Sequence, residues 1–227
     1  MSYLELAGAK RTLCTAAAIV VLVACGGACA AGQKDDETRM LALTELQSRD
    51  ADARLAACSV LAEIGKREDL PLLLSHLYDE DDRIRSTAEA AVWRIWGRSG
   101  DAATDRLFNR GLEQMREGQL RGAVDTFNRV IALRPDFAEG WNKRATVYFL
   151  LGEDELSLKD CDEVLKRNPQ HFGVLAGYGQ IYLRKGELQR ALDYFERAIA
   201  INPNMGGVQA SIDAVREIMV KRGRRFI

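Results

Sequence analysis

The sequence predicts an all-α protein, a right-handed α-solenoid built from helical hairpins. Matching residues recur at a fixed interval of 34 positions in the second half of the chain, and a looser repeat of 31 positions occurs in the first half. The composition agrees with helices, because Ala, Leu, Arg and Glu are frequent and the 227 residues contain only 4 prolines.

The 34-residue period runs through residues 104–203 and divides them into three repeats, 104–137, 138–171 and 172–203. Six positions of the repeat carry corresponding residues in all three copies. They are Pro135, Pro169 and Pro203; Gly118, Gly152 and Gly186; Ala123, Ser157 and Ala191; Gly111, Ala145 and Gly179; Leu107, Trp141 and Leu175; and Phe127, Cys161 and Phe195. Six positions that recur with one period are hard to produce by chance, so a repeat array is predicted for these residues.

Each recurring residue type has a physical role in a helical hairpin. The glycine at Gly118 and its equivalents ends the first helix, because glycine adopts positive φ at little cost. The small residue at Gly111 and its equivalents allows the two helices to approach closely, and each proline stops the second helix. These features resemble the tetratricopeptide repeat, whose period is 34 residues. Gln114 and Cys161 stand where that repeat usually has an aromatic residue, which weakens single contacts.

A closer resemblance covers about residues 90–227. The run from Asp136 to Thr146, together with Ile95-Trp96 and Ser99-Gly100, is similar to a group of small proteobacterial tetratricopeptide proteins. This resemblance implies no established biochemical activity. Residues 204–227 are expected to form a capping helix, with an apolar stripe at helical spacing. The stripe is Val208, Ile212, Val215, Ile218 and Met219.

Residues 37–99 contain the looser repeat. Arg54, Ala57, Leu61 and Ile64 recur 31 residues later as Arg85, Ala88, Val92 and Ile95. Acidic residues precede each copy, and they are expected to cap the helix that follows. They are Asp50 and Asp52 before the first copy and Asp79, Asp81 and Asp82 before the second. The pattern resembles HEAT-like repeats, in two weak copies. The alternative is a plain helical bundle that caps the tetratricopeptide array.

The N-terminus is predicted to be a secretory signal peptide, residues 1–24. Lys10 and Arg11 precede an apolar run of about 13 residues, which is short for a membrane span of about 20. The run ends in Leu22-Val23-Ala24-Cys25, which resembles the lipobox of bacterial lipoproteins and implies lipidation of Cys25. Residues 25–36 are then expected to be the lipidated cysteine and a flexible tether. Cleavage after Ala30 and retention of an uncleaved anchor are the two alternatives.

The first helix of each hairpin is expected to line a concave groove. The candidate groove-binding residues are Phe108, Leu112, Met115, Asn142, Lys143, Thr146, Phe149, Gln180 and Leu183. Chaperone-binding tetratricopeptide domains hold a terminal carboxylate with Lys, Asn and Arg, and only Lys143 matches such a position here. The sequence therefore favours an extended or helical peptide held by side-chain pockets and by a contact of its backbone with Asn142. Gly173 and Gly177 in one helix suggest close packing or room for a ligand.

Composition and motifs favour a non-enzymatic function. A net charge of −1 gives no strong field for nucleic acid, and no metal site, cofactor or small-molecule substrate is expected. His76 and His171 have no visible catalytic partner, and no catalytic residue is assigned. The leading hypothesis is a lipid-anchored, periplasm-facing adaptor of the cell envelope that binds a protein or peptide; the soluble periplasmic or secreted form is the alternative. A second hypothesis is an accessory subunit or assembly factor docked permanently through residues 37–99.

Overall fold

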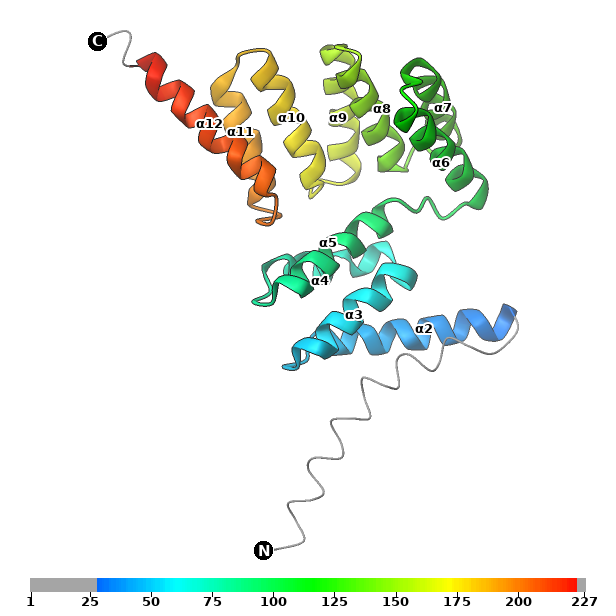
Figure 1. Cartoon of the computed structure of the whole chain (residues 1–227). Helices are drawn as coiled ribbons and strands as arrows, with labels where there is room; N and C mark the ends of the chain where they lie inside the picture. Colours follow the sequence, from blue (N-terminus) through cyan, green and yellow to red (C-terminus); the bar gives the residue numbers. More distant parts are fainter. Residues whose placement is uncertain (1–27, 224–227) are drawn as a thin grey trace, which may run out of the picture. The chain divides into compact units, whose positions relative to one another are not determined.

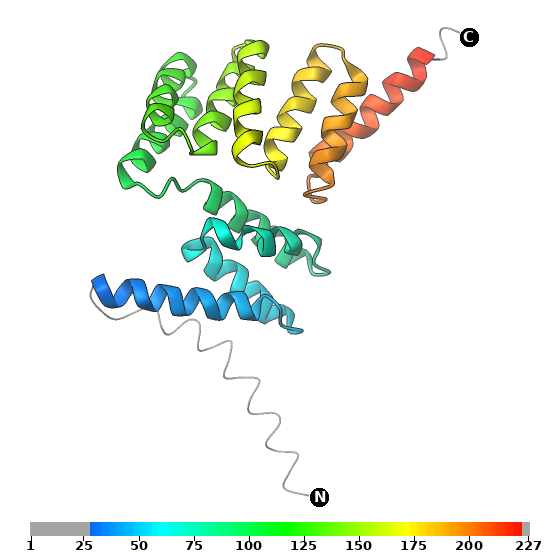
Figure 2. The same cartoon turned by 180° about the vertical axis from the view of Figure 1, so that it is seen from behind.

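The computed structural model describes the backbone of residues 28–223 and the side chains of residues 33–222. The chain divides into two compact units, Met1–Ile95 and Trp96–Ile227. Throughout the described residues the regular structure is helical, without strands (Figures 1 and 2). The predicted all-α solenoid of helical hairpins is confirmed.

The first unit consists of four α-helices and two short 3-10 helices over its described part. They are α2 (Ala28–Glu45), α3 (Ala51–Ile64), η1 (Arg67–Asp69), α4 (Leu70–Ser75), η2 (His76–Tyr78) and α5 (Asp82–Trp96), whose last residue belongs to the second unit. Asp50 caps α3 as predicted, since its carboxylate accepts a hydrogen bond of 3.0 Å from the Asp52 amide.

The predicted flexible tether over residues 25–36 is wrong from Ala28 onward, because α2 begins there. The segment was predicted to be flexible because its residues are small and polar. Its alanines, however, are strong helix formers. Contacts farther along the chain also hold the helix. Asp36 pairs with Lys66 at 2.7 Å, and Arg39 binds the buried carboxylate of Asp69 through two nitrogens. Cys25 lies outside the described residues.

The 31-residue repeat of the first unit reappears as repeated contacts. The Arg54 Nη1 atom donates to the carbonyl oxygens of Ser48 and Arg49, and the Arg85 Nη1 atom donates to those of Asp79 and Glu80. Each arginine thus ties its helix to the turn that precedes it. Arg54 also forms a two-point ion pair with Asp79, at 2.8 and 2.9 Å.

The second unit contains three helical hairpins and a final helix. The helices are α6 (Ala102–Arg116), α7 (Leu120–Leu133), α8 (Ala138–Leu150), α9 (Asp154–Arg167), α10 (Phe172–Arg184), α11 (Leu188–Ile199) and α12 (Gly206–Gly223), and they lie side by side in chain order (Figures 1 and 2). Gly118, Gly152 and Gly186 have φ of 73°, 78° and 75° in the turns inside the hairpins. The predicted left-handed stop after each first helix is confirmed.

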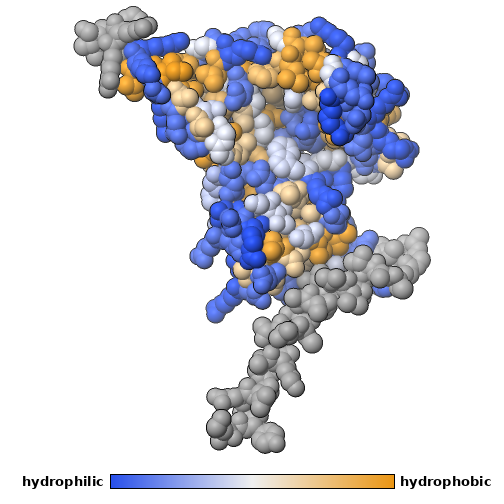
Figure 3. All heavy atoms as spheres, in the orientation of Figure 1, coloured by the Kyte–Doolittle hydropathy of each residue, from blue (hydrophilic) through white to orange (hydrophobic). Residues whose placement is uncertain are grey.

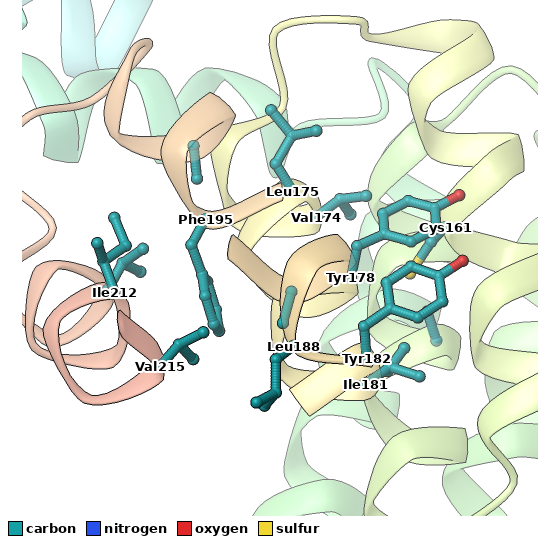
Figure 4. Packing of buried hydrophobic residues seen from close by; sticks show 14 of the residues in the cluster. Cys161, Val174, Leu175, Tyr178, Ile181, Tyr182, Leu188, Phe195, Ile212 and Val215 are labelled. Carbon is teal, nitrogen blue, oxygen red and sulfur yellow. The ribbon is translucent and has the colours of Figure 1, made fainter. Parts of the chain in front are cut away.

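Close packing inside the first and third hairpins depends on glycine. A Cβ atom on Gly111 would lie 2.7 Å from the Phe127 ring, and one on Gly179 would lie 2.3 Å from the Phe195 ring. Both phenylalanines are fully buried. In Figure 4, Ile212 and Val215 of α12 point toward Phe195 and cover its far side. The predicted C-terminal cap is therefore part of the core of the third repeat.

The outer surface of α12 retains apolar residues. Ile218 is 38% exposed and Val220 is 53% exposed, and apolar side chains gather along this helix in Figure 3. Within the part of the chain that the structure describes, no helix combines the length and the hydropathy required to cross a membrane.

Candidate functional site

A pocket of about 150 Å³ opens between α8, α9 and α10 of the second unit. A cavity of this volume is large enough for a ring the size of benzene, and hence for a leucine or methionine side chain. It is lined by Asn142, Ala145, Thr146, Phe149, Ser157, Cys161, Gly173, Val174, Gly177, Gln180 and Ile181. We refer to this site, defined by these residues, as the repeat pocket.

The repeat pocket exists because the second hairpin lacks the aromatic residue of the other two. Phe127 and Phe195 fill the space between the helices of the first and third hairpins, whereas Cys161 takes this position in the second. Gly177 leaves the opposite side open, because a Cβ atom there would meet no heavy atom within 4 Å. Val174 and Ile181, which Figure 4 shows in the same buried cluster as Cys161, supply apolar lining. The interior is therefore suited to an aliphatic side chain.

A buried hydrogen-bond network stands behind the Asn142 side chain. The Asn142 Nδ2 atom donates to Glu139 Oε2 at 2.9 Å, and Glu139 Oε1 lies 2.5 Å from His171 Nε2. The Val174 amide donates to His171 Nδ1 at 3.1 Å, so Nδ1 is the acceptor and Nε2 carries the proton that Glu139 accepts. His171 thereby caps α10 and joins two repeats.

The environment of Glu139 favours its ionised form. Burial raises the pKa of this carboxyl, but its contact with His171, the hydrogen bond from Asn142 and the nearby Lys143 lower the pKa by more, so that it lies below the ordinary value of a glutamate. The Lys143 Nζ atom lies 3.6 Å from Glu139 Oε2. The carboxylate at the base of this network is thus fully ionised at neutral pH.

The structure brings four of the nine predicted groove residues together. Asn142, Thr146 and Phe149 on α8 and Gln180 on α10 all line the repeat pocket. Leu183 packs against the core of the third repeat, while Lys143 contacts Glu139 and does not line the pocket.

The three candidates from the first repeat lie elsewhere. Phe108 is only 4% exposed and packs on Phe127 and Phe137, so its predicted place on the groove surface is wrong. Its register points inward in α6, and the Phe127 ring fills the space beside Gly111 of the same helix, so no pocket opens there. Leu112 and Met115 are partly buried against the same cluster.

Sequence reasoning left most of the pocket lining unassigned. Ala145 and Ser157 recur with the repeat and so indicate packing rather than a site, while Val174 and Ile181 are ordinary apolar residues without any signal of their own. Gly177 did carry a signal, as a glycine inside a helix that indicated either close packing or room for a ligand, and Cys161 did as the missing aromatic residue. Reading the two together would have located the pocket.

The buried cysteines and His76 have structural surroundings. Burial raises the pKa of both Cys58 and Cys161 to about 12, which keeps their thiols protonated and unreactive. The ring nitrogens of His76 lie 2.9 and 2.8 Å from the carbonyl oxygens of Leu72 and Leu46. No group of three or more metal-binding side chains is present among the residues described.

Successive helical hairpins, each turning at a left-handed glycine, define a class, the α-helical repeat proteins. The tetratricopeptide repeat family matches this chain at residues 108–170 and again at 173–205. The chain is 32% identical over 157 residues to a TPR repeat-containing protein of Rhizobium etli, with 69% of this chain and 77% of that protein covered. The chain belongs to the tetratricopeptide repeat protein family.

More distant similarities agree on the fold. The FK506-binding protein-like protein of Mus musculus is 29% identical, over 49% of this chain and 34% of its own length. The solved TPR domain of Sgt2 from Aspergillus fumigatus superposes with a TM-score of 0.52 at 16% identity, covering 55% of this chain and 83% of that domain. The first TPR of Spaghetti (RPAP3), solved with an HSP90 peptide bound, gives 0.50 at 18% identity, over 52% of this chain and 93% of that one.

Proposed function

We propose that this protein is a non-catalytic adaptor that binds a segment of a partner protein in the repeat pocket. The observation that carries the proposal is an open pocket of about 150 Å³ on the second and third repeats. Polar residues (Asn142, Thr146) and apolar residues (Phe149, Ile181) converge on it, which is the composition of a peptide-binding site. The peptide bound to the similar Spaghetti domain supports a protein ligand.

Filling the pocket from within should abolish binding. In the full chain, Gly177→Leu places a leucine side chain where the partner's side chain would lie. Peptides selected from a phage-displayed library of random 12-residue sequences on the wild-type protein should bind this variant at least about tenfold more weakly, since burial of one leucine is worth about 1.5–3 kcal/mol. Affinity is measured by fluorescence anisotropy.

Gly207→Leu is the matched control. Gly207 also has open space around its Cβ position, but it lies on α12 and does not line the pocket. Binding should remain at the wild-type level in this variant. Equal affinity of the selected peptides for the Gly177→Leu variant and the wild type, or failure to select any peptide, would refute the proposed function.

We further propose that the adaptor is exported and tethered by a lipid on Cys25. The support is the sequence of the apolar segment and its Leu-Val-Ala-Cys ending at residues 22–25. The envelope location follows from this anchor, and the soluble periplasmic or secreted form is the rival if cleavage occurs after Ala30.

Labelling of cells with a radioactive fatty acid tests the anchor. We expect label on the wild-type protein and on the Cys29→Ser variant, and none on Cys25→Ser, because the thiol of Cys25 is the acceptor. Label that persists on the Cys25→Ser variant would exclude this assignment.

The second candidate is an accessory subunit held permanently in an envelope complex through its HEAT-like first unit. Met40 is 58% exposed and Leu41 is 38% exposed on α2, which gives that unit an apolar surface of its own. Crosslinking in the native host separates the two roles. Partners lost in the Gly177→Leu variant support the adaptor, whereas partners that remain support docking through the first unit.

A further inference from the structure

The hydrogen bonds already made inside the protein determine what the repeat pocket can offer a ligand. The amide nitrogen of Asn142 is turned toward Glu139, so its Oδ1 atom faces the other way. The Thr146 hydroxyl donates its proton to the backbone carbonyl oxygen of Asn142 at 2.9 Å, so toward a ligand it can only accept a hydrogen bond. Ser157 at the pocket floor is used in the same way, since it donates to the Ala145 carbonyl at 2.8 Å. The α8 wall therefore presents hydrogen-bond acceptors.

The hydrogen bonds of Glu139 keep the Asn142 side-chain amide in this orientation. A carboxylate can only accept, so Glu139 selects the nitrogen of the Asn142 amide, and the proton of His171 Nε2 occupies its other oxygen. Glu139 is buried to 2% exposure, and inversion of the Asn142 amide would set two oxygens against each other in a region of low dielectric constant.

The two acceptors have a spacing that an extended chain can match. Asn142 and Thr146 are four residues apart on α8, which places them on one face with a rise of about 6 Å. Alternate N–H groups of an extended peptide lie about 6.6 Å apart on the same edge. A peptide laid along α8 can therefore donate to both side chains at once.

We propose that the repeat pocket recognises an extended peptide that donates two alternate backbone N–H groups to Asn142 Oδ1 and Thr146 Oγ1 and inserts one aliphatic side chain beneath Gly177. This rests on the proposed function and adds the chemistry of its ligand. A terminal carboxylate is a poor ligand for this wall, because an anion requires donors. A protonated amine lacks a countercharge, because no ionised side chain lines the pocket.

Ester substitution in the peptide tests the inference, because an ester replaces a single N–H by oxygen with little change in shape. The probe is a 12-residue peptide selected by phage display on the full-length protein, synthesised with one ester at each position in turn. We expect two sensitive positions, i and i+2, with one insensitive residue between them, each with a loss of about three- to tenfold in affinity.

Two variants assign each sensitive position to its acceptor. Thr146→Val removes one acceptor at nearly constant shape, and the ester effect at one position should disappear while the other persists. Glu139→Gln presents its amide nitrogen to Asn142, which should invert the Asn142 amide and remove the ester effect at the second position. Circular dichroism of both variants checks that they remain folded.

The outcomes separate this inference from the proposed function. If Gly177→Leu abolishes binding of the peptide but the peptide has no pair of ester-sensitive positions, the proposed adaptor function stands and the inference is overturned. Loss of binding on amidation of the peptide's C-terminus would also overturn it, since the anchor would then be a carboxylate. Binding unaffected by Gly177→Leu refutes both.

Discussion

Replacement of His171 by alanine should destabilise the second unit by about 3–5 kcal/mol, since removing one partner leaves the other of a buried pair uncompensated. Glu139 is 2% exposed and His171 is fully buried, with 2.5 Å between Oε1 and Nε2. The variant also loses the N-terminal cap of α10 and the stacking of His171 on Trp96, whose ring centroid is 4.4 Å away. We expect a melting temperature lower by roughly 10 °C in calorimetry of the full chain.

A double-mutant cycle isolates the part of this loss that comes from the pair. Glu139→Gln removes the charge, so alanine at position 171 should cost less in that background than in the wild type. The difference is expected to exceed about 1 kcal/mol. Simple additivity of the two substitutions would show that the pair does not stabilise the fold and that His171 acts only as a cap and a packing group.

Substitution of Gly179 by alanine should cost about 2–3 kcal/mol, the upper part of the range for overpacking a core. The new Cβ atom would lie 2.3 Å from Phe195 Cδ1 and 2.4 Å from Cε1, well inside contact distance. Phe195 cannot yield easily, because it is fully buried and covered by Ile212 and Val215 of α12. Urea unfolding of the full chain measures the loss.

Gly177→Ala, two residues earlier in the same helix, is the matched control. A Cβ atom at this position meets nothing within 4 Å, so only the helix preference of alanine remains, and the variant should be more stable by about 0.8–1 kcal/mol. The two substitutions are chemically identical and are expected to differ in sign. If Gly179→Ala proves as stable as Gly177→Ala, the close approach of α10 and α11 is not what requires glycine at 179.

The sequence was sufficient for those features that depend on local conformation. Gly118 and its equivalents at 152 and 186 take positive φ as expected, because a left-handed residue after a helix is a local requirement. The spacing of the prolines placed the hairpins for a similar reason. By contrast, the tether over residues 25–36 was wrong from Ala28, since α2 is held by pairs with residues 30 positions away, such as Arg39 with Asp69.

The candidate site was predictable only in part. Helical register brought Asn142, Thr146 and Phe149 to one side of α8 and predicted that they act together. The same reasoning misplaced Phe108, because register alone does not show whether a neighbouring helix covers a residue. The Phe127 and Phe137 rings cover it in the folded protein.

By itself the sequence therefore determined the class of this protein: an array of helical hairpins whose period, turns and caps follow from local chemistry repeated every 34 residues. Only the tertiary structure decided where the array contains the repeat pocket and which atoms line it. Cys161 and Gly177 lie on different helices, and together they leave room that neither leaves alone. Glu139 and His171 are 32 residues apart, and they orient Asn142 only because folding buries all three together.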